Sequence, residues 1–105
     1  MAGALISTTR AADGGVTVEV RGDVDVSSAD RLRHVLTDTA ALRPARIVVD
    51  LLHVTFIDST GIGALIAGRN TALGLGIGFA LRQPSAFVAG QLRQTGLYPA
   101  MVSDP

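Results

Sequence analysis

The sequence predicts a single α/β domain in which a mixed sheet of four or five strands is flanked by helices. Three observations support this prediction. Short apolar segments typical of strands alternate with longer segments of helical spacing, in the order β-β-α-β-α-β-α, with a short last strand to follow. Glycine and proline residues separate these segments. The 105 residues suffice for one hydrophobic core, so we assign residues 1–105 to one domain.

The first two elements are expected to be strands joined by a hairpin. Leu5–Ile6 is apolar, and Val16–Val20 alternates apolar and polar residues with period two. Between them, Asp13-Gly14-Gly15 supplies residues that tolerate positive φ. The second strand is expected to end in Gly22-Asp23-Val24-Asp25.

A helix is predicted to follow, with Ser27 as its N-cap and Asp30 placed to reach back to it. It runs to about Ala41, and Pro44 blocks its continuation. Its buried face is expected to comprise Ala29, Leu32, Val35, Leu36 and Thr39.

The second half of the chain repeats the strand-helix order. Arg46–Asp50 is nearly continuous in apolar character, as in a central strand covered by helices. A second helix is expected to end at Gly74 or Gly76, with helical spacing at Ile62, Leu65, Ile66, Arg69 and Leu73. Another strand is predicted over 77–81, a third helix from Pro84 and Ser85, and a short last strand over 98–102.

The composition excludes several classes of function. Nine arginines balance eight aspartates and one glutamate, and no run of arginines marks a nucleic-acid surface. The absence of cysteine excludes disulfides and thiolate chemistry and fits a reducing compartment. No segment has the pattern of a signal peptide or the length of a membrane span, so we expect a cytoplasmic protein without direct membrane insertion.

The most informative segment is Phe56-Ile57-Asp58-Ser59-Thr60-Gly61-Ile62-Gly63-Ala64. It lies between an apolar strand and a segment of helical spacing, which puts Ser59 at a helix start. Helix N-termini present unpaired N–H groups and a positive dipole end, so they accommodate anions. Three roles are therefore open for 58–60: binding a phosphate, carrying one covalently, or capping the helix.

Catalysis by Ser59 is poorly supported. A nucleophile elbow has glycines two positions on either side of the serine, and here Gly61 satisfies one side while Ile57 occupies the other. Neither His34, on the expected polar face of its helix, nor His53, expected on the same loop, is placed as a base. We therefore predict no enzymatic activity.

Nucleotide and metal sites are also poorly supported. The glycine-rich run 74–78 precedes a strand and lacks a Lys-Ser/Thr pair, so it is expected to be a helix end and a tight turn. Asp23 and Asp25 could share a cation with Asp58, but the chain has no calcium-loop spacing and no His/Cys cluster. No cofactor is predicted.

Phosphorylation of Ser59 is the sharper alternative to a capping role. The turn places its hydroxyl at the surface, and a phosphate there would add nearly two negative charges beside the Asp58 carboxylate. The helix N-terminus accommodates that charge, while a partner docked on the turn would meet it directly. From the residues alone, the cap remains the more frequent role.

Three motifs resemble the anti-sigma-factor antagonists of the STAS-domain family. Residues 56–65 resemble the signature of that family, 22–25 its earlier Gly-acid-apolar-Asp motif, and 95–97 its late Ser/Thr-Gly-Leu turn. The matching order of strands and helices extends the resemblance over most of the chain. It implies a STAS-like fold and makes Ser59 the expected phosphoacceptor.

The resemblance also implies a function. In that family the dephosphorylated antagonist binds an anti-sigma factor that is also a serine kinase of the GHKL type, and the sigma factor is released. The kinase phosphorylates the serine corresponding to Ser59, with Thr60 as the candidate minor acceptor, and a serine phosphatase reverses the modification. Asp25 corresponds to a motif aspartate near the phosphoserine. We expect the phosphosite surroundings and partner contact to include Asp23, Asp25, Asp58, Gly61 and Ile62.

Exposed apolar residues around the turn are expected to add to the partner surface: Val54, Phe56, Ile62 and Ile66. Each of the four has the core as its alternative, which is the more frequent role at helical spacing. STAS domains also serve as accessory subunits of lipid-transport complexes and as tails of anion transporters, where the same turn works without phosphorylation. The alternative function is therefore an unphosphorylated accessory subunit of a membrane transport complex.

Overall fold

The structure, a computed structural model, describes residues 3–96. Its sheet has the strand order β1-β2-β3-β4. The strands are β1 (Leu5–Arg10), β2 (Val16–Val24), β3 (Arg46–Ile57) and β4 (Gly78–Arg82). β1 and β2 form the expected antiparallel hairpin, whereas β2, β3 and β4 are parallel, so the sheet is mixed as predicted. The strand expected over 98–102 and Leu97 of the late motif lie outside the described residues.

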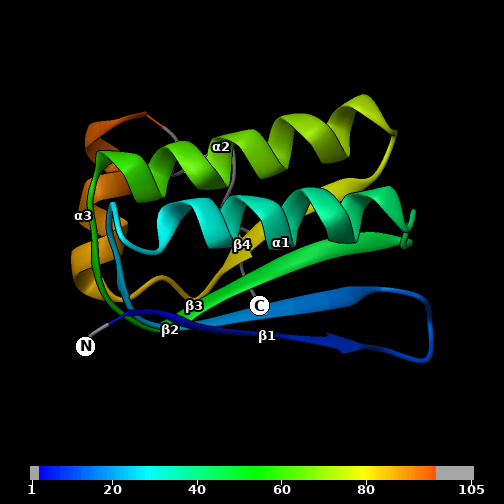
Figure 1. Cartoon of the computed structure of the whole chain (residues 1–105), viewed down its shortest axis with the longest axis horizontal. Coiled ribbons are helices and arrows are strands. Elements are labelled where there is room, and N and C mark those ends of the chain that lie inside the picture. The colour runs from blue at the N-terminus through cyan, green and yellow to red at the C-terminus, as the bar shows by residue number, and fades with distance from the viewer. Residues whose placement is uncertain (1–2, 97–105) are drawn as a thin grey trace.

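Three helices complete the described part of the chain: α1 (Ala29–Ala41), α2 (Ser59–Gly74) and α3 (Ala86–Gln94). Figure 1 shows α1 and α2 side by side over one face of the sheet, with α3 at the end of the sheet where β3 finishes. Right-handed β-α-β crossovers put the two long helices there. The observed order is therefore the predicted one.

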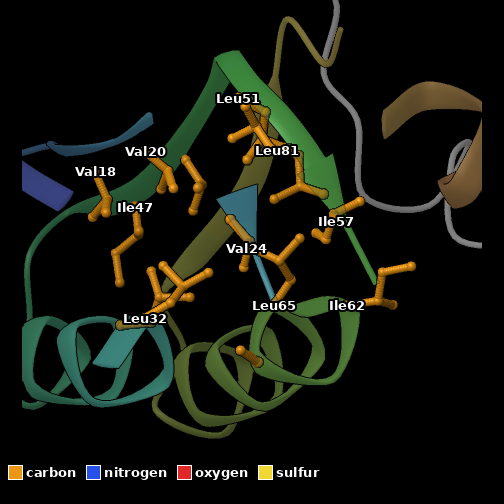
Figure 2. Close-up of a cluster of buried hydrophobic side chains, with 14 of the residues drawn as sticks. Val18, Val20, Val24, Leu32, Ile47, Leu51, Ile57, Ile62, Leu65 and Leu81 are labelled. Carbon is orange, nitrogen blue, oxygen red and sulfur yellow. The ribbon is translucent and has the colours of Figure 1, made fainter. Parts of the chain in front are cut away.

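The core fills the space between the sheet and these two helices. Figure 2 shows side chains from β2, β3, β4, α1 and α2 pointing toward one another. Every second residue of β2 is buried as far as Val20, which accounts for its alternating sequence. The fully buried members include Val18, Val20, Leu32, Leu36, Ile47, Leu51, Ile57, Leu65 and Leu81.

A glycine sets the distance between α1 and α2. A Cβ added at Gly68 of α2 would lie 2.6 Å from Cδ1 and 2.7 Å from Cβ of Leu36 on α1. Only a residue without a side chain allows this approach, because protein interiors leave no spare volume for an added methyl group. The helices therefore pack through a contact that the apolar spacing alone does not reveal.

Two predicted boundaries are wrong. β3 continues to Ile57 instead of ending at Asp50, so His53 lies in the strand and not on a loop. Irregular register between β2 and β3 leaves two pairs of adjacent β3 residues exposed, Leu52–His53 and Thr55–Phe56, so the continuing strand does not show a period-two pattern. The N-cap of α1 is Ser28, not Ser27. Helix α2 starts at Ser59 as predicted, and its N-cap is Asp58.

Candidate functional site

The predicted site residues meet at the carboxyl-terminal edge of the sheet. Val24, the last residue of β2, pairs with Ile57, the last residue of β3. The backbone N–H of Asp58 donates to the Val24 carbonyl oxygen at 3.2 Å. The segments that lead into α1 and α2 therefore lie beside each other, as neighbouring parallel strands require.

Asp58 caps α2 with one carboxylate oxygen. Its Oδ1 accepts hydrogen bonds from the Thr60 N–H at 3.0 Å, the Gly61 N–H at 3.1 Å and the Thr60 hydroxyl at 2.5 Å. The Thr60 hydroxyl and then the Gly61 N–H are the main causes that hold the pKa of Asp58 below its ordinary value. Asp58 is therefore a charged N-cap, and Ser59 does not serve as one.

Ser59 stands exposed at the first position of α2. Among residues 3–96 its hydroxyl has no hydrogen-bond partner, in contrast to the Thr60 hydroxyl. It lies at the positive end of a helix of 16 residues, where an added anion is electrostatically favoured. The geometry leaves the Ser59 oxygen accessible to an external enzyme.

The aspartates of the earlier motif hold the adjoining segment. Asp25 Oδ1 accepts hydrogen bonds from the Ser27 N–H at 2.9 Å and the Ser27 hydroxyl at 2.6 Å. Asp23 Oδ1 accepts one from the Thr55 hydroxyl at 2.6 Å, which ties β2 to β3. Because Asp25 engages the Ser27 hydroxyl, helix α1 begins one residue later than expected.

Gly61 lets α2 start directly on the sheet. A Cβ at this position would lie 2.7 Å from both the Val24 carbonyl oxygen and Ile57 Cγ1. Its expected place beside the phosphosite therefore has a steric reason: a larger residue would push the turn away from β2 and β3.

Of the apolar residues expected on the partner surface, two belong to the core. Val54 is 1% exposed and Ile62 is 6% exposed, so the expectation that they are exposed is wrong, and Ile66 is only partly buried. Their helical or strand spacing is that of core residues. Phe56 is exposed as expected, and its ring stacks on Phe87 of α3 with centroids 5.5 Å apart.

A pocket adjoins the turn on the helix side. It has a volume of about 320 Å³ and lies between the first turns of α1 and α2, lined by Val26, Ala29, Asp30, Arg33, Thr60, Gly63 and Ala64. Val26 is 78% exposed, and a Cβ at Gly63 would meet no atom within 4 Å. Neither this pocket nor Phe87 was predicted from the sequence. The one sequence feature that could have indicated the pocket is Val26, an apolar residue between Asp25 and Ser27.

The weaker candidate sites do not form. Within residues 3–96, no group of three or more acidic, histidine or cysteine side chains could hold a metal ion. The glycine-rich run ends α2 and turns into β4, with Gly76 at φ 76°, which confirms a helix end and tight turn. Gly96, at the end of α3, also has φ 76°, in keeping with the expected late turn.

No helix in the described part of the chain has the length and apolar character to cross a membrane.

A family model described as "Mlab, STAS domain" matches residues 7–102. The chain belongs to the STAS-domain family. No curated protein sequence matches it significantly.

Solved structures agree with this assignment. The STAS domain is similar to an anti-sigma factor antagonist from Mycobacterium paratuberculosis at 26% identity and a TM-score of 0.84, over 93% of this chain and 82% of that one. It shares its fold with the unphosphorylated anti-sigma factor antagonist SpoIIAA at 18% identity and a TM-score of 0.81, over 96% and 88%. A sulfate transporter family protein from Wolinella succinogenes matches at 27% identity and a TM-score of 0.74, over 89% and 75%.

Proposed function

We propose that this STAS domain is an anti-sigma-factor antagonist whose binding is controlled by phosphorylation of Ser59. In its dephosphorylated form it binds an anti-sigma factor that is also a GHKL-type serine kinase, and a sigma factor is released. The kinase transfers phosphate to Ser59 and the complex weakens; a serine phosphatase restores the binding form. In this proposal the domain is a cytoplasmic binding protein, and the chemistry belongs to its partners.

The single observation that carries the proposal is the exposed hydroxyl of Ser59 at the start of α2, which has no hydrogen-bond partner within residues 3–96. Asp58 already satisfies the Thr60 and Gly61 N–H groups, so Ser59 is not needed as a cap. A phosphate there would stand at the positive end of the helix and would leave the fold intact. A structure of the phosphorylated form of the Bacillus protein SpoIIAA, which has a similar fold at a TM-score of 0.76, supports the proposal that this fold can carry a phosphate.

The surface around Ser59 suits a partner that is sensitive to charge. The pocket, with exposed Val26 and open Gly63, is lined by the adjacent residue Thr60, and the exposed Phe56, stacked on Phe87, precedes the turn by two residues. We infer that the kinase buries these apolar groups together with the uncharged serine. A phosphate beside Asp58 would then place two like charges in a desolvated contact, which opposes binding.

A second function is favoured by two of the comparisons. The matching family model carries the name Mlab, and a sulfate transporter family protein is among the structural neighbours. An unphosphorylated STAS domain acting as accessory subunit of a lipid or anion transport complex would use the same surface. It would bind a transport ATPase or permease and would take up no phosphate.

One experiment separates the two functions. Ser59→Ala is used as bait in an extract of the source bacterium, and the captured partner is purified and incubated with the wild-type domain and radiolabelled ATP. A GHKL kinase that labels Ser59 supports the phosphorylation-controlled function. A transport ATPase or permease in the eluate, with no label on Ser59 or Thr60, contradicts it and supports the accessory subunit.

A further inference from the structure

Five hydroxyl side chains lie in the two segments that enter α1 and α2, and four of them are donors in hydrogen bonds. The Ser27 hydroxyl donates to Asp25, the Thr55 hydroxyl to Asp23 and the Thr60 hydroxyl to Asp58. The fourth is Ser28, which is 1% exposed; its hydroxyl donates to the Asp23 carbonyl oxygen at 3.0 Å. Within residues 3–96, Ser59 alone of these five has a hydroxyl without a hydrogen-bond partner.

We propose that Asp23, Asp25 and Asp58 determine which hydroxyl is phosphorylated, by holding the competing hydroxyls of Thr55, Ser27 and Thr60. This inference rests on the proposed function and adds to it a reason for the choice of site. Thr55, Ser27 and Thr60 are exposed like Ser59, so accessibility alone does not distinguish them. Their hydrogen bonds to carboxylates distinguish them from Ser59.

The chemistry of transfer explains why an engaged hydroxyl is a poor acceptor. The acceptor oxygen forms a bond to the γ-phosphorus of ATP, the bond from that phosphorus to the β,γ-bridging oxygen breaks, and ADP leaves with the electron pair. The hydroxyl proton passes to a base of the kinase. An engaged hydroxyl must first break a charge-assisted hydrogen bond, which is stronger than a neutral one.

The adjacent carboxylate adds a second obstacle. At 2.5–2.6 Å from each engaged hydroxyl, its negative charge would stand close to the incoming γ-phosphate and repel it. Within residues 3–96, no carboxylate accepts a hydrogen bond from the Ser59 hydroxyl. The three aspartates are thus positioning residues that act on neighbouring hydroxyls.

Site-resolved labelling tests the proposal. The purified kinase and ATP with Mg²⁺ are incubated with wild type, Asp25→Ala, Asp23→Ala and the control Asp38→Ala, and phosphopeptides are quantified by mass spectrometry. Asp38 is an exposed acid of α1 that does not line the pocket and accepts from no hydroxyl in the described chain. Circular dichroism and urea unfolding verify that each variant is folded.

In wild type and Asp38→Ala, we expect Ser59 to carry nearly all the label. In Asp25→Ala the ratio of Ser27 to Ser59 label should rise about 10-fold or more, and in Asp23→Ala the ratio of Thr55 to Ser59 label should rise likewise. Asp25→Asn retains an acceptor oxygen for Ser27, so it should restore the wild-type ratio. A merely structural role of Asp25 would lower total labelling without moving it to Ser27.

The outcomes distinguish this inference from the function on which it rests. Label on Ser59 with unchanged ratios in Asp25→Ala and Asp23→Ala overturns the hydroxyl selection and leaves the switch standing. Equal label on Ser59, Thr60 and Ser27 in wild type also overturns the selection. No label on any of them overturns both.

Discussion

Gly61 lies against the backbone of Val24 so closely that a Cβ on Gly61 would stand 2.7 Å from the Val24 carbonyl oxygen. The same oxygen accepts the hydrogen bond from the Asp58 N–H. The end of β2 therefore fixes both the cap and the first turn of α2. These two contacts fix the position of Ser59, because Ser59 lies between Asp58, which donates to the Val24 carbonyl oxygen, and Gly61, which packs against it.

Gly61→Ala should destabilise the domain by about 1–3 kcal/mol, since the added methyl group overlaps backbone that cannot move aside. Urea unfolding measures the change. Gly63→Ala is the matched control two residues along the same helix, where an added Cβ meets open space. It should be stabilised by about 0.5–1 kcal/mol, because alanine favours a helix over glycine. Equal effects of the two substitutions would contradict the steric role of Gly61.

Ser59→Ala should fold as wild type and bind the partner kinase in the presence of ADP without being switched off. Ser59→Asp should also fold, because a carboxylate at a helix N-terminus is favourable. Its binding should be weaker by about 2–4 kcal/mol, roughly 30- to 1000-fold, since it adds a charge beside Asp58 in a desolvated contact. Calorimetric titration of both variants against the kinase measures the difference. Equal affinities would remove the electrostatic basis of the switch.

Gly63→Leu should weaken kinase binding about 10-fold or more without loss of stability, because its side chain enters the pocket beside Thr60. Gly74→Leu is the control: it makes the same substitution at the last residue of α2, where a Cβ also meets no atom within 4 Å. Surface plasmon resonance on both variants, with urea unfolding in parallel, gives the comparison. If both variants bind like wild type, the pocket is not part of the interface.

The charged cap predicts a pH dependence of stability. The folded-state pKa of Asp58 is lowered, chiefly by the Thr60 hydroxyl and the Gly61 N–H. Its contribution is therefore fully present above the ordinary value of 3.8 and is lost as the pH falls through the lower folded value. Compared with wild type, Asp58→Asn should lose less stability between pH 6 and pH 3. Urea unfolding at both pH values measures this difference, and parallel pH profiles would contradict it.

Phe87→Ala tests the contribution of the Phe56–Phe87 pair to the proposed interface. Removing the ring that stacks on Phe56 takes away part of the apolar area beside the turn, and we expect weaker kinase binding by about 0.5–1.5 kcal/mol. Both rings are more than a third exposed, so the loss of stability should be smaller than for a core phenylalanine. Binding equal to wild type would restrict the interface to the pocket and Ser59.

Local patterns predicted the elements better than their ends. Alternation in 16–20 and helical spacing in 29–39 reported burial directly, so these elements and their order are correct. The end of β3 was missed because the irregular pairing with β2 exposes Leu52 and His53 together, which breaks the alternation. The N-cap of α1 was misassigned and that of α2 stayed open, because Asp, Ser and Thr all favour that position and only the hydrogen bonds decide among them.

The candidate site was predicted in part. The resemblance grouped Asp23, Asp25 and Asp58 around Ser59, and the structure brings their segments together at one edge of the sheet. The pocket and the Phe56–Phe87 pair join residues from separate elements, which no local pattern reports. Ile62 lies inside the signature segment but is buried, so a place in the motif does not indicate that a side chain is exposed.

The turns before α1 and α2 share one arrangement. In Asp25-Val26-Ser27, as in Asp58-Ser59-Thr60, the aspartate accepts both the N–H and the hydroxyl of the residue two positions later. Val26 therefore occupies in the first turn the place of Ser59 in the second, and both are exposed. Under the proposed function, the middle residue alone makes one turn a phosphorylation site and the other a constant apolar contact. We therefore expect Val26→Ser to give the domain a second phosphorylation site and to remove one exposed apolar side chain from its surface.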